Sequence, residues 1–472
     1  MFPIDISKGS AASGNSAGTG RLTAVRPSDR QVAWQELEFT AFFHFGMNTF
    51  TNRSWGTGQE DPVIYNPARL DTGQWCEAIL EAGIKACILT AKHHDGFCLW
   101  PTAYTSHSVM SSGKPADVVA MLADSCRGYG LKFGIYLSPW DRHERTYGQG
   151  AAYDDFFCGQ LEELTTRYGE LYTLWFDGAC GEGPDGRVQV YDWDRYFAII
   201  RKNQPNAVIS SMGPDVRWIG NESGITRDSE WSVVSARLRD RTSIAASSQQ
   251  EDAHKPLSPM EDDLGSRGAL ENEPTLCWYP AEVDVSIRPE WFYHPEENDK
   301  LRGVDDLLHI YETSVGGNAV LLLNIPPDTD GRVNENDAAR LRELGSLLRS
   351  IYGGNLCAGA VATDGAGKDI SHVLMDDDSF WRGDPQAAVV TIRFASKRSI
   401  RRVVLCEQIR QSQRIESFEI AMVSEGRRGP VFTGTTVGFK KICAFDPVEA
   451  ESLEISITQS REWPTLRFVA VY

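Results

Sequence analysis

The chain lacks the long hydrophobic runs and the cysteine spacing that mark several protein classes. None of its apolar runs approaches the roughly 18 residues that a membrane-spanning helix needs, so no membrane partner is expected. Its 10 cysteines include no Cys-x-x-Cys pair, which argues against a zinc ribbon and a dithiol redox motif. No Gly-x4-Gly-Lys-Ser/Thr loop is present either, which argues against P-loop nucleotide chemistry.

The chain also has little excess of positive charge anywhere to attract a polyanion. Its formal net charge is −18, so nucleic acid and anionic surfaces would be repelled over most of the molecule. A neutral or polar small molecule is the better match as a partner. The share of hydrophobic residues, 41%, is typical of an ordinary globular protein with a substantial core.

The start of the chain and the setting of its cysteines bear on the cellular compartment of the protein. Residues 1–5 lack a basic region followed by an apolar stretch, so no secretory signal is recognised in the chain as given. Cysteines such as Cys87 and Cys406 lie inside apolar runs and are interpreted as small buried hydrophobes. These features favour the cytoplasm, or the periplasm or exterior if a signal was removed. Residues 1–25, rich in Gly, Ser and Ala, are expected to be flexible.

Helical and strand-like segments alternate through the first 330 residues. Continuous apolar strands between amphipathic helices indicate a parallel sheet covered by helices. At least six such strands suit a (β/α)8-like barrel better than an open sheet. The expected strands are 39–45, 85–91, 131–137, 171–176, 207–210 and 319–323, and the expected helices are 72–82, 117–129, 153–168, 193–202, 305–314 and 336–351.

The sequence pattern changes after residue 353. Short β-rich runs separated by polar turns follow residue 353, which predicts an antiparallel β-sandwich. We therefore expect a flexible N-terminus over 1–25, a barrel over 26–352 and a β-sandwich over 353–472. The polar, acidic stretch 228–273 is expected to form a long loop over the carboxyl ends of the barrel strands.

Polar side chains follow several of the predicted strands. Asp177 comes directly after the run 171–176, and His93, His94 and Asp95 follow the run 85–91. Catalytic groups of such barrels gather at the carboxyl ends of the strands. Position alone leaves Asp177 equally open to a turn-capping role. His44, near the end of the first predicted strand, is either a core histidine or a member of the same pocket.

Two chemistries remain open for the histidine pair. Adjacent residues on a strand face opposite ways, so His93 and His94 are poor joint ligands of one metal ion unless the backbone turns between them. Hydrogen bonding to a polar substrate is the favoured interpretation, and a metal-dependent hydrolase using both histidines and Asp95 is the alternative. Aromatic residues gather near the same strand ends, as they do where a sugar's C–H face is bound: Trp55, Trp100, Tyr136, Trp140, Trp175 and, further along the chain, Trp278.

Four motifs in fixed order give the chain a resemblance to the α-L-fucosidases of glycoside hydrolase family 29, over roughly residues 30–350. The motifs are Phe43-His44-Phe45-Gly46, His93-His94-Asp95-Gly96-Phe97, Trp175-Phe176-Asp177-Gly178 and Leu322-Leu323-Asn324-Ile325-Pro326-Pro327-Asp328. The resemblance implies a (β/α)8-like barrel with a β-sandwich behind it, no metal, no cofactor, and hydrolysis with retention of configuration. It also implies that Asp177 is the nucleophile.

The same resemblance implies the remaining site residues. The loop at Asn221-Glu222-Ser223-Gly224 and the run 281–289 resemble the subfamily acting on α1,3/1,4-linked fucose, in which this glutamate is the acid/base. Glu182, Glu230 and Glu282 are its rivals. Implied sugar-binding residues are His44, Trp55, His93, His94, Tyr136 and, from aromatic clustering, Trp278. Many relatives have an acidic residue where this chain has Ser54, so one sugar contact is expected to be either missing or supplied by Glu60.

The predicted function is therefore a retaining exo-α-L-fucosidase whose partner is a fucosylated oligosaccharide with a terminal α1,3/1,4-linked fucose. Two alternatives stand beside it: a broad-specificity fucosidase that also accepts α1,2 linkages and aryl fucosides, and a non-catalytic fucose-binding protein.

Overall fold

The computed structural model describes residues 16–248 and 262–472. Its N-terminal half is built on eight parallel strands, and most of them are buried along their whole length. These strands are β1 (Phe39–Phe43), β2 (Ala86–Lys92), β3 (Lys132–Leu137), β4 (Thr173–Phe176), β5 (Val208–Ser211), β6 (Arg217–Trp218), β9 (Ala281–Ser286) and β10 (Ala319–Asn324).

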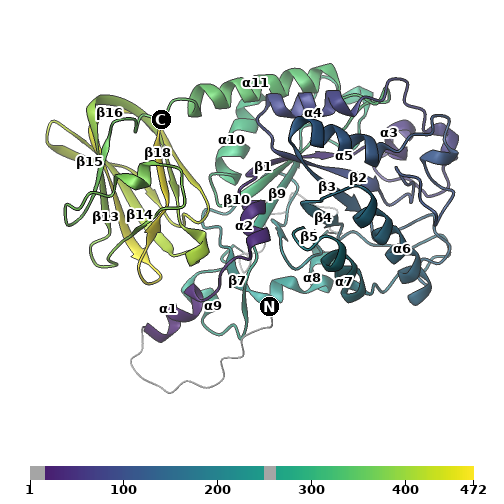
Figure 1. Cartoon of the computed structure of the whole chain (residues 1–472), viewed down its shortest axis with the longest axis horizontal. Helices are drawn as coiled ribbons and strands as arrows, with labels where there is room; N and C mark the ends of the chain where they lie inside the picture. The colour runs from purple at the N-terminus through teal and green to yellow at the C-terminus, as the bar shows by residue number, and fades with distance from the viewer. Residues whose placement is uncertain (1–15, 249–261) are drawn as a thin grey trace.

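The strands form one sheet in the order β5-β4-β3-β2-β1-β10-β9-β6, and each neighbouring pair is parallel. A parallel bridge between Ser210 and Val216 joins the two edges, so the sheet nearly closes on itself. Figure 1 shows the strands of this sheet from the side, with helices around them. The predicted (β/α)8-like barrel is confirmed.

The helices around the barrel begin where the sequence supplies a cap. Asp71, Asp117 and Asp192 each accept a hydrogen bond from a backbone N–H in the first turn of the helix that follows. The α-helices among the described residues are α1 (Ser16–Thr23), α2 (Asp29–Gln35), α3 (Met47–Thr51), α4 (Thr72–Glu81), α5 (Val118–Tyr129), α6 (Ala151–Arg167), α7 (Trp193–Asn203), α8 (Arg241–Ser248), α9 (Arg267–Leu270), α10 (Val304–Ser314) and α11 (Glu335–Tyr352). No helix among the described residues is long and apolar enough to cross a membrane.

Two barrel strands are absent from the prediction. Strand β6 has only two residues, too few to leave a periodic signal. Strand β9 reads Ala-Glu-Val-Asp-Val-Ser, an alternation that places Glu282 and Asp284 on one face. That face points into the barrel, and both carboxyl side chains are buried.

The C-terminal half is antiparallel β-structure, as predicted. Its six-stranded sheet runs β11-β13-β16-β14-β15, with β18 also paired to β13. The β-rich runs include one long strand, β13, which carries register shifts between Arg393 and Arg398 and between Ile400 and Arg402. The strands are β11 (Val361–Asp364), β12 (Trp381–Arg382), β13 (Val389–Cys406), β14 (Ile415–Ser424), β15 (Arg427–Gly434), β16 (Lys441–Ser460), β17 (Thr465–Leu466) and β18 (Phe468–Val471).

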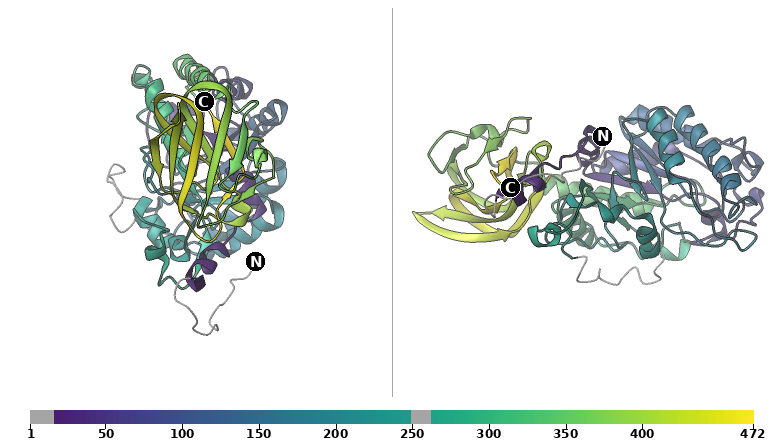
Figure 2. Two further views of the ribbon diagram at one scale, coloured as in Figure 1. Left: turned by 90° about the vertical axis from the view of Figure 1, so that its left-hand side faces the viewer. Right: turned by 90° about the horizontal axis from the view of Figure 1, so that it is seen from below.

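This β domain packs against the end of the barrel where the strands begin. Asn318, immediately before β10, accepts a hydrogen bond from the N–H of Phe439, and Gly317 forms a backbone bridge with Lys441. Figures 1 and 2 show the β domain to one side of the barrel, beyond that end. Each half has its own hydrophobic core, one between Phe39 and Leu344 and one between Cys357 and Val471. The domain limits at 26, 352 and 353 stay a prediction.

The expectation for 228–273 is wrong where the structure describes it. The segment contains β7 (Val233–Ser235), which pairs with β8 (Leu276–Trp278). Its first residues lie against the β domain, where the carbonyl of Asp228 accepts from Thr435, and its helix α8 packs on α7, where Arg241 contacts Phe197 and Asp194. The carbonyl of Glu230 accepts hydrogen bonds from Asn318 and Gln413. Residues 249–261 lie outside the described residues.

The expectation of a flexible lead-in also changes. Within residues 1–25, only those from 16 onward are described, and they form helix α1. Leu22 is buried in a small cluster with Val32, Val233, Leu270, Trp278 and Ile409, and the Thr23 hydroxyl donates to Glu462. This stretch is therefore tied to both the barrel and the β domain.

Candidate active site

A pocket of about 120 Å³ opens at the carboxyl ends of the barrel strands. Polar and aromatic side chains from β1, β2, β3, β4, β5, β6, β9 and the loops after them meet there. They are Phe42, His44, Ser54, Trp55, His93, His94, Tyr136, Trp175, Asp177, Ser211, Trp218, Glu222, Asp284 and Trp291. Residues separated by more than 200 positions in the chain thus face one space.

Asp177 is held in one orientation at the end of β4. The N–H of Ala179 donates to Oδ1 at 2.8 Å, and the Tyr136 hydroxyl donates to Oδ2 at 2.9 Å. Nε2 of His94 lies 3.7 Å from Oδ2. The side chain is still 23% exposed, so its carboxylate is fixed and also reachable from the pocket. A fixed, accessible carboxylate suits attack on a bound substrate.

Three histidines line the wall beside Asp177. Nδ1 of His44 lies 2.8 Å from the amide oxygen of Asn324, and Nδ1 of His94 lies 2.7 Å from the Ser138 hydroxyl. Because that hydroxyl donates its proton to the Trp140 carbonyl, His94 must donate through Nδ1. In both rings this leaves Nε2 as an acceptor for a ligand.

His93 carries its ring proton on the other nitrogen, Nε2. Its Nδ1 lies 3.3 Å from the side-chain nitrogen of Asn48, a donor, so Nδ1 accepts and Nε2 carries the proton. Burial lowers the pKa of His44 to about 3 and that of His94 to about 4, and it lowers the pKa of His93 well below the usual range. The pocket therefore offers neutral donors and acceptors, the set that sugar hydroxyls need.

Glu222 lies on the exposed loop after β6 and reaches the mouth of the pocket. Nε1 of Trp291 donates to its Oε2 at 2.8 Å. Trp291 in turn packs on His44, with ring centroids 5.0 Å apart. The structure thus brings Glu222 into the same pocket as Asp177, although the two residues come from different loops.

The rivals of Glu222 do not line this pocket. Glu230 is buried and paired with Arg217 and Arg227, whose charges lower its pKa against the effect of burial. Glu282 lies inside the barrel, where its Oε1 accepts from Nε1 of Trp175 at 2.6 Å. Glu182 is exposed on the loop after β4, and its carbonyl accepts from Trp140.

Two expected sugar contacts lie elsewhere. Trp278 is buried in β8, and its Nε1 donates to Gln35. Glu60 turns back on its own loop, where its carboxylate accepts from the N–H groups of Thr57 and Gly58. Tertiary packing, which the sequence does not record, directs both side chains away from the pocket.

Two other residues of the loop that carries Glu60, Ser54 and Trp55, do line the pocket. Trp55 is 52% exposed and packs edge-on against His94 and Trp140, with centroids 5.5 Å apart in both cases. The Ser54 hydroxyl donates to Glu290 at 2.6 Å. The acidic group beside position 54 therefore belongs to Glu290 and not to Glu60.

Sequence reasoning missed Asp284, Trp218 and Trp291. Asp284 is buried at the pocket wall, where its Oδ1 accepts from Nε1 of Trp218 at 2.7 Å. Burial, and then the nearby charge of Glu222, raise the pKa of Asp284 well above its usual range. The alternation of polar and apolar residues in β9 is the sequence signal that could have placed Asp284 beside Glu282 on the inner face of the barrel.

The set of residues that could bind a metal ion differs from the predicted set, because Asp177 takes the place of Asp95. Asp95 turns away from the pocket, and its Oδ1 accepts from the N–H of Phe97 at 2.7 Å. Among the described residues, His93, His94 and Asp177 have ligand atoms within 4.8 Å of one another. His94 approaches Asp177 through Nε2, the ring nitrogen that its hydrogen bond to Ser138 leaves available, and such an atom can bind a sugar hydroxyl as well as a cation.

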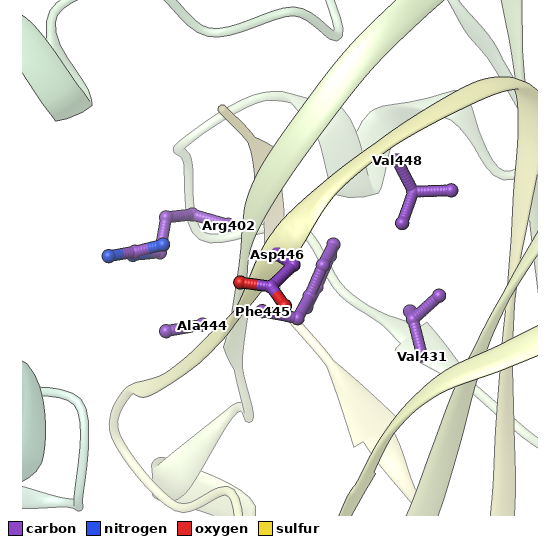
Figure 3. Close-up of a pocket in the computed structure, with 6 residues that line it drawn as sticks. All are labelled: Arg402, Val431, Ala444, Phe445, Asp446 and Val448. Carbon is purple, nitrogen blue, oxygen red and sulfur yellow. The ribbon is translucent and has the colours of Figure 1, made fainter.

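A second hollow lies on the β domain, about 650 Å³ in volume (Figure 3). Its lining includes one aromatic side chain, Phe445, and the charged residues Arg402 and Asp446. Arg402 is already bound to Glu312 of α10 at 2.8 Å. The hollow therefore has neither the paired carboxyl groups nor the aromatic wall of the barrel pocket.

A (β/α)8-like barrel whose strand ends gather carboxyl groups, neutral histidines and tryptophans defines a hydrolase of the glycosidase class. The comparisons agree and are more specific. The alpha-L-fucosidase family model matches residues 32–353, and the chain belongs to that family. It is a glycoside hydrolase that releases fucose, which removes the non-catalytic alternative.

Relatives support this assignment over nearly the whole chain. Alpha-L-fucosidase 1 of Arabidopsis thaliana is 39% identical over 463 residues, covering 94% of this chain and 87% of that protein. A glycoside hydrolase 29 family member from a rumen bacterium is 33% identical, with a TM-score of 0.79 over 95% of this chain and 77% of that one. A Ruminococcus gnavus fucosidase in complex with fucose is 27% identical, with a TM-score of 0.81 over 98% and 97%.

Proposed function

We propose that this α-L-fucosidase acts by double displacement with retention, with Asp177 as nucleophile and Glu222 as acid/base. The observation that carries the proposal is that these two carboxyl groups line one pocket, while the three other candidate glutamates lie outside it. Retaining glycosidases place two such groups about 5 to 5.5 Å apart.

The surroundings of the two carboxyl groups suit different roles. Asp177 has its hydrogen-bond donors in place before substrate arrives, so its carboxylate is preorganised to attack the anomeric carbon. Glu222 lies at the exposed mouth, where the leaving part of the substrate would pass. There it donates a proton to the departing oxygen and then takes one from the water that releases fucose.

The neutral histidines and aromatic residues are proposed to hold the sugar. His44, His93 and His94 present both donors and acceptors at Nε2, and Tyr136 contributes through its hydroxyl. Trp55 covers the rim with an exposed ring. Glu60 and Trp278 are no longer proposed as contacts, because neither lines the pocket.

The small volume of the pocket, about 120 Å³, supports exo action on a single terminal fucose. We further propose a preference for α1,3/1,4 linkages. The two segments that suggested this preference, the Glu222 loop and the run 281–289, are in direct contact through a backbone bridge between Ser223 and Val285. Broad specificity that includes α1,2 linkages and aryl fucosides is the alternative.

Two measurements test the proposal. Proton NMR of the first product should show the α anomer of fucose, and initial formation of the β anomer would rule out retention. Rates on Lewis a and Lewis x trisaccharides, 2′-fucosyllactose and an aryl α-fucoside should show the Lewis compounds preferred. Equal kcat/KM on all of them would favour broad specificity.

A further inference from the structure

The loop that carries Glu222 is attached to strand β9 directly beside Asp284. Ser223 and Val285 form an antiparallel backbone bridge. Side chains alternate along a strand, so residues adjacent to a bridged pair point to the opposite side from that pair. Val285 points into the apolar core of the barrel wall, which leaves Glu222 and Asp284 on the pocket side.

Asp284 is placed there by more than the strand. Nε1 of Trp218 donates to its Oδ1 at 2.7 Å, and Trp218 comes from β6, in register with β9 opposite Glu282. The segment 217–222 therefore supplies both the donor that fixes Asp284 and the glutamate that lies next to it.

The charges around Asp284 are all acidic or neutral. Glu222 faces it from the loop, Glu282 lies two residues back on the same strand, and Asp177 lines the pocket from β4. No Lys or Arg side chain lines this pocket in the part of the chain that the structure describes. The three pocket histidines are neutral because burial lowers each pKa. The pocket lining therefore supplies no positive side-chain charge to offset two adjacent carboxylates, and the indole N–H groups of Trp218 and Trp291 donate to them as neutral groups.

We propose that Asp284 and Glu222 share one proton, and that Asp284 is the positioning residue that keeps this proton available to Glu222. The inference rests on the proposed role of Glu222 as acid/base. Removal of the last proton would leave two anions side by side at a partly buried site, so the pair holds it to a higher pH than a lone glutamate would.

The proton balance follows the two steps of the reaction. In the first step the pair delivers its one proton through Glu222 to the leaving oxygen, while Asp177 forms the bond to the anomeric carbon. Both members of the pair are then ionised. In the second step water attacks that carbon, and its proton passes to Glu222 and restores the shared proton. No other reactant is needed.

Asp284→Asn is the sharpest variant, because the amide oxygen still accepts from Trp218 but the second carboxyl group is gone. The pH profile of kcat/KM reports the essential groups of the free enzyme. Its alkaline limb should move to lower pH by about one unit or more. The loss at neutral pH should be larger on a fucosylated oligosaccharide than on an aryl fucoside with a good leaving group, which needs little acid assistance.

Trp218→Phe tests the same pair in the other direction. The indole N–H stabilises ionised Asp284, so its removal favours the protonated form and should move the alkaline limb to higher pH. Glu163→Gln is the matched control, since Glu163 is a buried carboxylate that accepts from Nε1 of Trp100 at 2.8 Å but lies outside the pocket. Its profile should coincide with that of the unmodified enzyme.

The outcomes separate this inference from the assignment of Glu222. An Asp284→Asn profile that coincides with the unmodified one overturns the shared proton, and so does a downward or absent shift in Trp218→Phe. Glu222→Gln tests the acid/base role by itself: full activity on an oligosaccharide would refute that role whatever the Asp284 variant does. Loss of activity in Glu222→Gln with no shift in Asp284→Asn would refute only the pairing.

Discussion

The Tyr136 hydroxyl donates a 2.9 Å hydrogen bond to Oδ2 of Asp177. The two residues lie at the ends of neighbouring parallel strands, since Tyr136 pairs with Trp175, two residues before Asp177. Burial, and then the charge of Asp177, raise the pKa of Tyr136 well above its usual range, so the phenol keeps its proton and stays a donor. A permanent donor at this oxygen leaves one direction open for attack.

Replacement of Asp177 by Asn should lower kcat by about 10³-fold or more, because the nucleophile is lost while the shape of the side chain is kept. Assays on an aryl α-fucoside would measure it. Asp185→Asn, on the exposed loop that follows, is the control and should retain activity. Activity of Asp177→Asn close to that of the unmodified enzyme would exclude Asp177 as nucleophile.

Glu222→Ala should be slow in hydrolysis and recover with azide. Azide needs no general base, and its attack on the β-linked fucosyl-enzyme would yield α-fucosyl azide. The product can be identified by NMR. Glu182→Ala, which removes an exposed glutamate outside the pocket, should behave like the unmodified enzyme. Rescue in the Glu182 variant instead would transfer the role.

Tyr136→Phe should reduce kcat/KM roughly 10- to 100-fold, the range expected for loss of one hydrogen bond to a charged group. The fold should be unchanged, because the ring stays in place. Tyr147→Phe removes a buried hydroxyl that is hydrogen-bonded to Tyr191 and does not line the pocket, and it should have a small effect. Equal losses in the two variants would show that the effect is structural.

Exhaustive chelation should leave activity unchanged. A cation bound by His93, His94 and Asp177 would neutralise the proposed nucleophile and occupy the acceptors proposed for fucose. Activity and metal content measured before and after chelation decide the point. Loss of activity that is restored by one divalent metal would support the metal-dependent alternative.

Glu282→Gln should stabilise the protein increasingly as the pH rises. Burial raises the pKa of Glu282 to about 7, so the folded state holds a proton that the unfolded state has lost between pH 4.5 and 7. Stability from this group is therefore present below pH 4.5 and lost as the pH rises through 7, on the order of 2–3 kcal/mol. The amide avoids that loss.

Denaturant unfolding at pH 4.5 and pH 8 measures this effect. The difference in unfolding free energy between Glu282→Gln and the unmodified protein should grow in favour of the variant at pH 8. Glu170→Gln, at an exposed position, should show the same difference at both values. A difference for Glu282→Gln that stays constant with pH would mean that the carboxyl group does not titrate in this interval.

Much of the barrel was predictable because its strands and helices carry local signals. The six expected strands and six expected helices all form, with ends shifted by a few residues. Strand ends that deliver Asp177, His93 and His94 were visible for the same reason. β6 was not predictable, since a two-residue strand exists only through its partner β9.

The sequence by itself determined the barrel class, the family and the place of Asp177 at a strand end, because apolar periodicity and contiguous motifs are properties of neighbouring residues. Only the tertiary structure decided which carboxyl groups share the pocket. Glu222 and Asp284 lie far apart in the chain and meet through one backbone bridge, whereas Glu60 and Trp278 are turned aside by their own packing. Side-chain direction depends on contacts between distant segments, which no local pattern records.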